Sequence, residues 1–141
     1  MKDSSNKCID YKSNKSIGYK VYKNSSVLPQ KNKRNSWGVG GVVNSKMEFI
    51  YNSGYTGWTS FGGEYVFKTH VCSNDDVIWF GNLINHWGHF IVDNLSRLWW
   101  VIEQDLTERK IVYVSSDDRI HKNIVRFIEL LGVNPDRFVR I

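Results

Sequence analysis

The first half of the chain carries short apolar bursts separated by polar and turn-forming residues. The bursts cover residues 19–22, 39–43, 47–51 and 64–67, and turn sequences such as Asn52-Ser53-Gly54 and Phe61-Gly62-Gly63 lie between them. Apolar bursts bounded by Gly, Asn and Ser are typical of strands joined by turns. The pattern predicts a β-rich N-terminal segment over residues 1–74.

From residue 75 onward, short apolar runs alternate with longer amphipathic stretches. Residues 77–80 and 110–114 are largely apolar and are typical of buried strands. Residues 86–104 hold no Pro, and their apolar positions recur with helical spacing. The expected stripe consists of Trp87, Ile91, Leu98 and Ile102, flanked by Phe90, Leu95 and Val101. A helix is predicted here, with Asn85 as its N-cap.

A second strand–helix–strand step follows. Residues 120–131 predict a helix, and residues 137–141 predict a third strand. The helix places Ile124, Phe127, Ile128 and Leu131 on one face, and Gly132 stands where a C-terminal glycine belongs. This order predicts an α/β fold, with a Rossmann-like parallel β-α-β-α-β half over residues 75–141. Because parallel sheets are normally covered on both faces, we expect the half to continue beyond residue 141 in a longer protein.

Composition favours a folded domain over a disordered or membrane-spanning chain. Of the 141 residues, 41% are hydrophobic and 14% are aromatic, which is enough to fill a core. No apolar run approaches the roughly 18–20 residues of a membrane span, and no signal peptide is visible. Cys8 and Cys72 have no zinc-site spacing and are interpreted as free thiols in a reducing cytoplasm.

Charge is distributed unevenly along the chain. The formal net charge is +5, and Lys and Arg crowd into the first 34 residues. A basic leader rich in Ser and Asn is interpreted as a solvated surface, so no nucleic-acid partner is predicted. Attraction of the leader to anionic lipid, an acidic glycan or a nucleotide stays open. The chain is expected in the cytoplasm, with peripheral association at the inner face of the membrane as an open alternative.

Four polar residues of the first predicted helix carry the candidate chemistry. His86, His89, Asp93 and Arg97 follow one another at spacings of three, four and four, and therefore share one helix face. The neighbouring faces are apolar, so this line should be partly enclosed and its charges should pair internally. The helix also starts after the carboxyl end of a strand, where open α/β sheets bind their ligands.

Three interpretations of this line stay open. It can be purely structural, with an intrahelical ion pair and a histidine near the helix start. It can hold a metal through His86, His89 and Asp93, completed by His70 or Cys72. It can instead serve an organic ligand, which we favour over the metal because Arg97 would compete for the Asp93 carboxylate and add positive charge.

Residues 86–99, His-Trp-Gly-His-Phe-Ile-Val-Asp-Asn-Leu-Ser-Arg-Leu-Trp, resemble the hallmark helix of glycosyltransferase family 61. The family pattern is roughly Asn-Tyr-Gly-His, three residues, Asp, two residues and Pro-Arg-Leu-Trp. The positions that match at the family's spacing are Gly88, His89, Asp93, Arg97, Leu98 and Trp99. His86 replaces the usual Asn, and Ser96 replaces the usual Pro.

The resemblance implies the N-terminal domain of an inverting GT-B glycosyltransferase of surface or capsular polysaccharide biosynthesis. A saccharide acceptor would bind here, and a nucleotide-sugar donor would bind mainly to a second domain, so the isolated chain would be inactive. His89 and Asp93 are the candidate catalytic pair, as base and orienter or as part of the acceptor site. The predicted substrate-binding residues are Asn85, His86, Gly88 and Arg97, and no metal or cofactor is predicted.

An alternative of another class is a small carbohydrate- or protein-binding module without catalysis. Its support is the aromatic content, because tryptophans can stack on sugars. The six tryptophans are Trp37, Trp58, Trp79, Trp87, Trp99 and Trp100. Tryptophans in apolar stripes are more often part of a core, so this alternative ranks below the glycosyltransferase.

Overall fold

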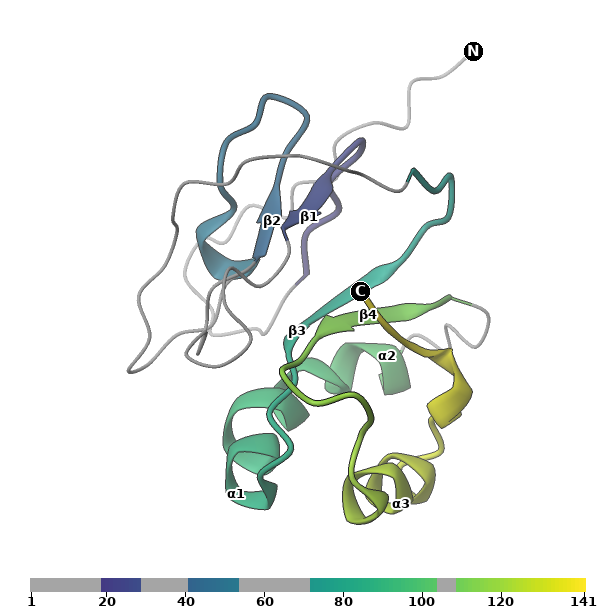
Figure 1. Ribbon diagram of the computed structural model, residues 1–141. Coiled ribbons are helices and arrows are strands. Elements are labelled where there is room, and N and C mark those ends of the chain that lie inside the picture. Colours follow the sequence, from purple (N-terminus) through teal and green to yellow (C-terminus); the bar gives the residue numbers. More distant parts are fainter. Residues whose placement is uncertain (1–18, 29–40, 54–71, 104–108) are drawn as a thin grey trace, which may run out of the picture.

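The computed structural model describes residues 19–28, 41–53, 72–103 and 109–141, and shows a mixed α/β fold (Figure 1). In the first part, β1 (Ser26–Leu28) pairs antiparallel with β2 (Gly41–Val43). A 3-10 helix covers Tyr51–Ser53. The described part of the predicted burst 39–43, residues 41–43, therefore forms a strand. The burst 19–22 forms no strand. In the burst 47–51, Phe49 forms an isolated bridge and Tyr51 begins the 3-10 helix. The predicted burst 64–67 lies outside the described residues.

The second part contains the predicted parallel sheet. β3 (Ile78–Asn82), β4 (Ile111–Val114) and β5 (Phe138–Arg140) are parallel, in the order β3-β4-β5. A broken helical stretch connects β3 to β4, and α3 (Lys122–Leu130) connects β4 to β5. The helices lie on one side of this sheet and the β1–β2 pair on the other (Figure 1). A hydrogen bond of 2.6 Å from Trp79 Nε1 to Ser53 O joins the two parts.

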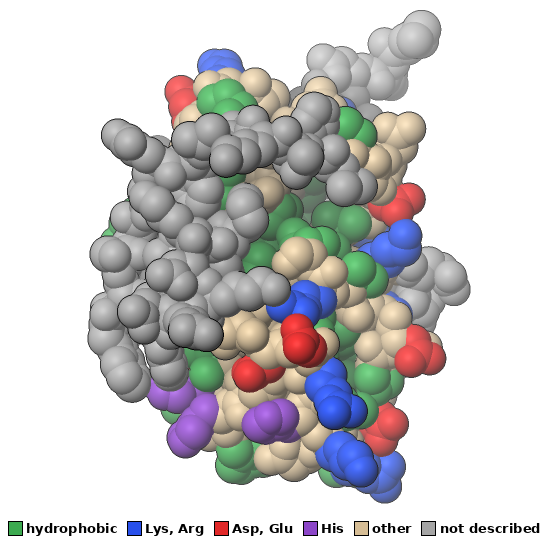
Figure 2. All heavy atoms as spheres, in the orientation of Figure 1, with side chains coloured by type: hydrophobic (Ala, Val, Ile, Leu, Met, Phe, Trp, Pro, Cys, Tyr) green, Lys and Arg blue, Asp and Glu red, His purple; other side chains and the backbone are tan. Residues whose placement is uncertain are grey.

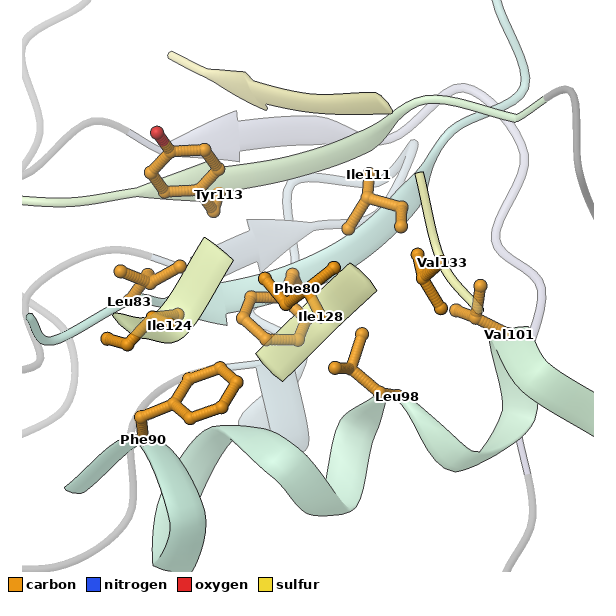
Figure 3. Close-up of a cluster of buried hydrophobic side chains, with 10 residues drawn as sticks. All are labelled: Phe80, Leu83, Phe90, Leu98, Val101, Ile111, Tyr113, Ile124, Ile128 and Val133. Atoms are coloured by element: carbon orange, nitrogen blue, oxygen red, sulfur yellow. The ribbon is translucent and has the colours of Figure 1, made fainter. Parts of the chain in front are cut away.

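The core lies between the parallel sheet and its helices (Figure 3). Its buried side chains are Phe80, Leu83, Phe90, Leu98, Val101, Ile111, Tyr113, Ile124, Ile128 and Val133. Every residue of β4 is buried, as expected for a central parallel strand. Gly132 ends α3 with φ +78°, and Val133 N donates to Ile128 O at 3.2 Å. The predicted glycine C-terminus is confirmed.

The first helix differs from the regular one that the sequence predicts. It consists of α1 (Trp87–His89), a π-turn (Phe90–Asn94), a 3-10 turn (Leu95–Arg97) and α2 (Trp99–Glu103). The π-turn is wider than an α-turn and the 3-10 turn is narrower, so the buried face departs from one helical period.

The predicted apolar stripe of this helix is confirmed at Phe90, Leu98 and Val101, which are buried, and at Leu95, which packs against the core. It is wrong at its other three positions. Trp87, Ile91 and Ile102 are 40%, 40% and 44% exposed. The residues that the helix buries are Phe90, Asn94, Leu98 and Val101. Among the described residues, no helix is long and apolar enough to cross a membrane.

Candidate functional site

The predicted pair of His89 and Asp93 forms in the structure. His89 Nδ1 lies 3.0 Å from Asp93 Oδ2; His89 directly precedes the π-turn, and Asp93 lies within it. The two side chains are 19% and 23% exposed, so both are largely enclosed and still reachable from solvent. The expected coupled pair is confirmed as geometry, whereas its catalytic role stays a prediction.

The bond between His89 and Asp93 fixes the chemistry of the imidazole. An ionised carboxylate can only accept hydrogen bonds, so His89 Nδ1 carries the hydrogen and donates it. In the neutral ring, Nε2 is then the basic nitrogen. The arrangement suits a side chain that accepts a hydrogen bond or a proton from a hydroxyl group. A positive charge that develops on the ring is stabilised by the Asp93 carboxylate.

Arg97 lies against β3 where the strand has no side chain. A Cβ atom on Gly81 would lie 2.9 Å from Arg97 Nη1, and Gly81 has φ +101°. β3 shifts register against β4 between Trp79 and Gly81. Burial lowers the pKa of the Arg97 guanidinium, and the charge of Asp93 opposes that shift. Because arginine titrates far above neutral pH, the site keeps a partly buried positive charge close to Asp93.

His86 and Gly88 lie at the exposed start of the helix. His86, not Asn85, is the N-cap residue, and its side chain makes no capping hydrogen bond. The His86 ring stands edge-on to the His89 ring, with 5.2 Å between centroids. A Cβ on Gly88 would meet the His86 ring at an ordinary 3.5 Å. Packing therefore does not demand glycine at this position, and a role in ligand approach stays a prediction.

Asn85 holds two loops together instead of capping the helix. Its Nδ2 donates to Asp117 Oδ2 at 3.0 Å and to Arg119 O at 2.7 Å. Its Oδ1 accepts from His121 N at 2.9 Å. These bonds tie the loop after β3 to the loop after β4. They give Asn85 a structural role. Its predicted role in substrate binding stays a prediction.

Asn94 is a polar residue of the site region that the sequence analysis missed. It is 1% exposed, and its Nδ2 donates to Asn82 O at 2.8 Å. Within the described residues, Asn94 Oδ1 is buried without a hydrogen-bond partner. An unmet buried acceptor costs roughly 1–3 kcal/mol. The one signal in the sequence that could have indicated a buried amide is its spacing: Asn94 is four residues from both Phe90 and Leu98, and therefore lies on the same helix face as these two apolar residues.

The site lies at the carboxyl end of β3. Figure 2 shows histidine side chains gathered at the end of the molecule where α1 lies in Figure 1, with acidic and basic side chains beside them. Arg140, the last residue of β5, reaches Asp118 in the loop after β4, with 2.9 Å between Nη1 and Oδ1. Polar contacts thus follow the carboxyl edge of the parallel sheet, the edge at which such sheets bind ligands.

A metal centre finds no support in the described part of the chain. No group of three or more His, Cys, Asp or Glu side chains there could hold a metal ion. Cys72 is an exposed free thiol. His70 and Cys8 lie outside the described residues.

Chelation is therefore expected to leave the fold unchanged. Thermal unfolding of the chain with and without EDTA should give the same midpoint, because no described ligand set couples metal binding to folding. Elemental analysis of the purified protein is the companion measurement. A stoichiometric transition metal that is lost together with folding would restore the interpretation based on His86, His89 and Asp93.

No protein-family model matches the chain, and comparisons with curated proteins and with solved structures find no match. The likeness of residues 86–99 to glycosyltransferase family 61 therefore rests on the motif residues themselves.

Proposed function

We propose that this chain forms the acceptor-binding, N-terminal part of an inverting glycosyltransferase similar to family 61. The observation that carries the proposal is the bond of 3.0 Å between His89 and Asp93, within the motif that resembles that family. The parallel β-α-β-α-β unit supports a Rossmann-like half of a GT-B enzyme. Surface or capsular polysaccharide is the proposed product class.

In the proposed reaction, an acceptor hydroxyl lies against His89. Its oxygen attacks the anomeric carbon of the donor sugar, and the bond from that carbon to the nucleoside diphosphate breaks. His89 Nε2 takes the hydroxyl proton, and Asp93 stabilises the resulting imidazolium. Arg97 supplies a partly buried positive charge that can orient polar groups of the saccharide.

Ligand binding by the isolated chain tests this division of labour. We expect weak binding of neutral and uronic-acid disaccharides in saturation-transfer NMR, and no measurable calorimetric binding of UDP- or GDP-sugars. Arg97→Gln should weaken the saccharide signal, whereas Arg126→Gln should not, because Arg126 is on the exposed face of α3. Micromolar binding of a nucleotide sugar would overturn the placement of the donor site outside this chain. Absence of any saccharide signal would overturn the acceptor role.

A carbohydrate-binding module without catalysis is the second candidate. The observation in its favour is Trp87, which is 40% exposed beside His86 and His89 and stacks on Phe90 with 5.9 Å between ring centroids. An exposed aromatic ring can stack on a sugar face. If saccharide binding depends on Trp87 and is indifferent to Asp93→Asn, the module is favoured over the enzyme.

A further inference from the structure

We propose that the acceptor site extends from the helix that carries His89 onto the loop that follows β4, and that Asn85 is the positioning residue that holds this loop. The loop after β3 covers residues 83–86 and leads into α1, whereas the loop after β4 covers residues 115–121 and leads into α3. With this extension, which rests on the proposed function, His121 joins the residues expected to contact the saccharide.

The two loops leave the parallel sheet as one hydrogen-bonded unit. Leu83 N donates to Val114 O at 2.8 Å, just beyond the last strand residue of β3. Ser115 Oγ then donates to Leu83 O, also at 2.8 Å. Because Leu83 and Ser115 are 1% and 4% exposed, water does not readily replace either bond. The first residue of each loop is thereby fixed against the first residue of the other.

Asn85 joins the two loops a second time, close to their far ends. Its Nδ2 donates to Asp117 Oδ2 at 3.0 Å and to Arg119 O at 2.7 Å, and its Oδ1 accepts from His121 N at 2.9 Å. The reverse orientation of the amide would turn its hydrogens toward the N–H of His121 and its oxygen toward two acceptors, so the orientation is determined. Three bonds to one loop hold the backbone of that loop beside the start of α1.

This contact places His121 beside the candidate site. Asn85 directly precedes His86, and 5.2 Å separate the centroids of the His86 and His89 rings. The N–H group that donates to Asn85 Oδ1 belongs to His121 itself. His86 and His121 are both exposed, and Figure 2 shows the end of the molecule at which histidine side chains gather. A ligand that lies over His89 therefore has the loop after β4 next to it.

The chemistry of the loop after β4 suits a sugar. Loops at the carboxyl edge of a parallel sheet are the ones that bind its ligands. An imidazole can donate or accept a hydrogen bond, as the hydroxyl groups of a saccharide require. The two acidic residues of the loop have other partners, because Asp117 accepts from Asn85 and Asp118 Oδ1 lies 2.9 Å from Arg140 Nη1. His121 is the side chain that we expect to reach the sugar, since the bond to its own N–H fixes its backbone.

The imidazole NMR signals of His89 and His121 test how far the site extends. The probes are neutral and uronic-acid disaccharides, titrated into the wild-type chain. We expect the signals of both histidines to shift with the same dissociation constant, because one saccharide contacts both. Shifts at His89 without shifts at His121 overturn the extension and leave the acceptor role intact. If neither histidine responds, the acceptor role and the extension are both overturned.

Asn85→Ala tests the positioning role. Loss of the three bonds should free the loop after β4, so the saccharide-induced shift at His121 should disappear while that at His89 is retained. The affinity should fall by up to about tenfold, which corresponds to roughly one hydrogen bond. If this variant does not fold, Asn85→Asp is measured instead, since its carboxylate accepts from His121 N but cannot donate to Asp117 or Arg119. A His121 shift that is retained in the folded variant overturns the positioning role.

Asn44→Ala is the matched control, because the Asn44 side chain also makes three hydrogen bonds. Its Nδ2 donates to Glu48 Oε2 at 2.8 Å, and its Oδ1 accepts from Lys46 N at 2.9 Å and from Glu48 N at 3.0 Å. These bonds follow β2, on the other side of the parallel sheet from the helices (Figure 1). The variant should lose a comparable amount of thermal stability and keep the wild-type histidine shifts with saccharide. Loss of these shifts in Asn44→Ala as well would assign the effect to general destabilisation and overturn the positioning role of Asn85.

Discussion

Replacing Gly81 with alanine is expected to lower the free energy of unfolding by about 1–3 kcal/mol. Gly81 has φ +101°, a backbone conformation that side chains with a Cβ rarely adopt. The new methyl group would also lie 2.9 Å from Arg97 Nη1. Because the guanidinium lies at the end of a flexible side chain, we expect the Arg97 side chain to move away from the new methyl group while the backbone of β3 stays in place. Urea unfolding measures the loss of stability.

Gly132→Ala is the matched control for this substitution. Gly132 has φ +78°, but a Cβ there meets nothing within 4 Å. Both variants should lose comparable stability from backbone strain, and only Gly81→Ala should also weaken saccharide binding, because it displaces Arg97. Equal saccharide binding by the two variants would show that the position of Arg97 against Gly81 does not contribute to the binding site.

The regular elements of the second half follow from local patterns. The helix α3 is predicted from two signals that lie close together in the sequence. These are the four-residue spacing of Ile124 and Ile128 and the glycine that follows Leu131. The i, i+4 spacing of His89 and Asp93 is equally local, and it survives the change from α-turn to π-turn. The parallel order of β3, β4 and β5 follows from the two helical connections.

The departures arise where distant residues decide the structure. The π-turn coincides with the bond from Asn94 to Asn82, 12 residues apart, which no periodicity reveals. Asn85 resembles an N-cap in sequence, but its partners lie 32 to 36 residues away. Similarly, residues 19–22 alternate like a strand, whereas the Tyr19 ring packs on Trp100 with 4.4 Å between centroids. Tertiary contacts override local preference at each of these positions.

Under the proposed function, Asp93→Asn is expected to reduce glycosyl transfer by roughly 10²–10⁴-fold in a protein that contains this chain and the proposed donor-binding domain. The amide of asparagine has nearly the same shape as the carboxylate, and the native Asp93 side chain is 23% exposed. The fold should therefore persist. The amide can accept through its oxygen or donate through its nitrogen, so it does not fix the Nδ1–H form of His89. Because it carries no charge, it also does not stabilise the imidazolium that forms when Nε2 takes a proton. Steady-state kinetics should place the loss mainly in kcat.

Glu129→Gln provides the matched exchange of carboxylate for amide. Glu129 Oε2 lies 3.1 Å from Arg126 Nη1 in an exposed pair on α3, and such surface pairs contribute only about 0–1 kcal/mol. This variant should transfer sugar at the wild-type rate with the same thermal midpoint. Comparable activity of Asp93→Asn and Glu129→Gln would exclude Asp93 from the reaction and leave the pair a purely structural role. A large loss confined to Asp93→Asn, with both variants folded, assigns the effect to the charge beside His89, because the chemical change is the same at both positions.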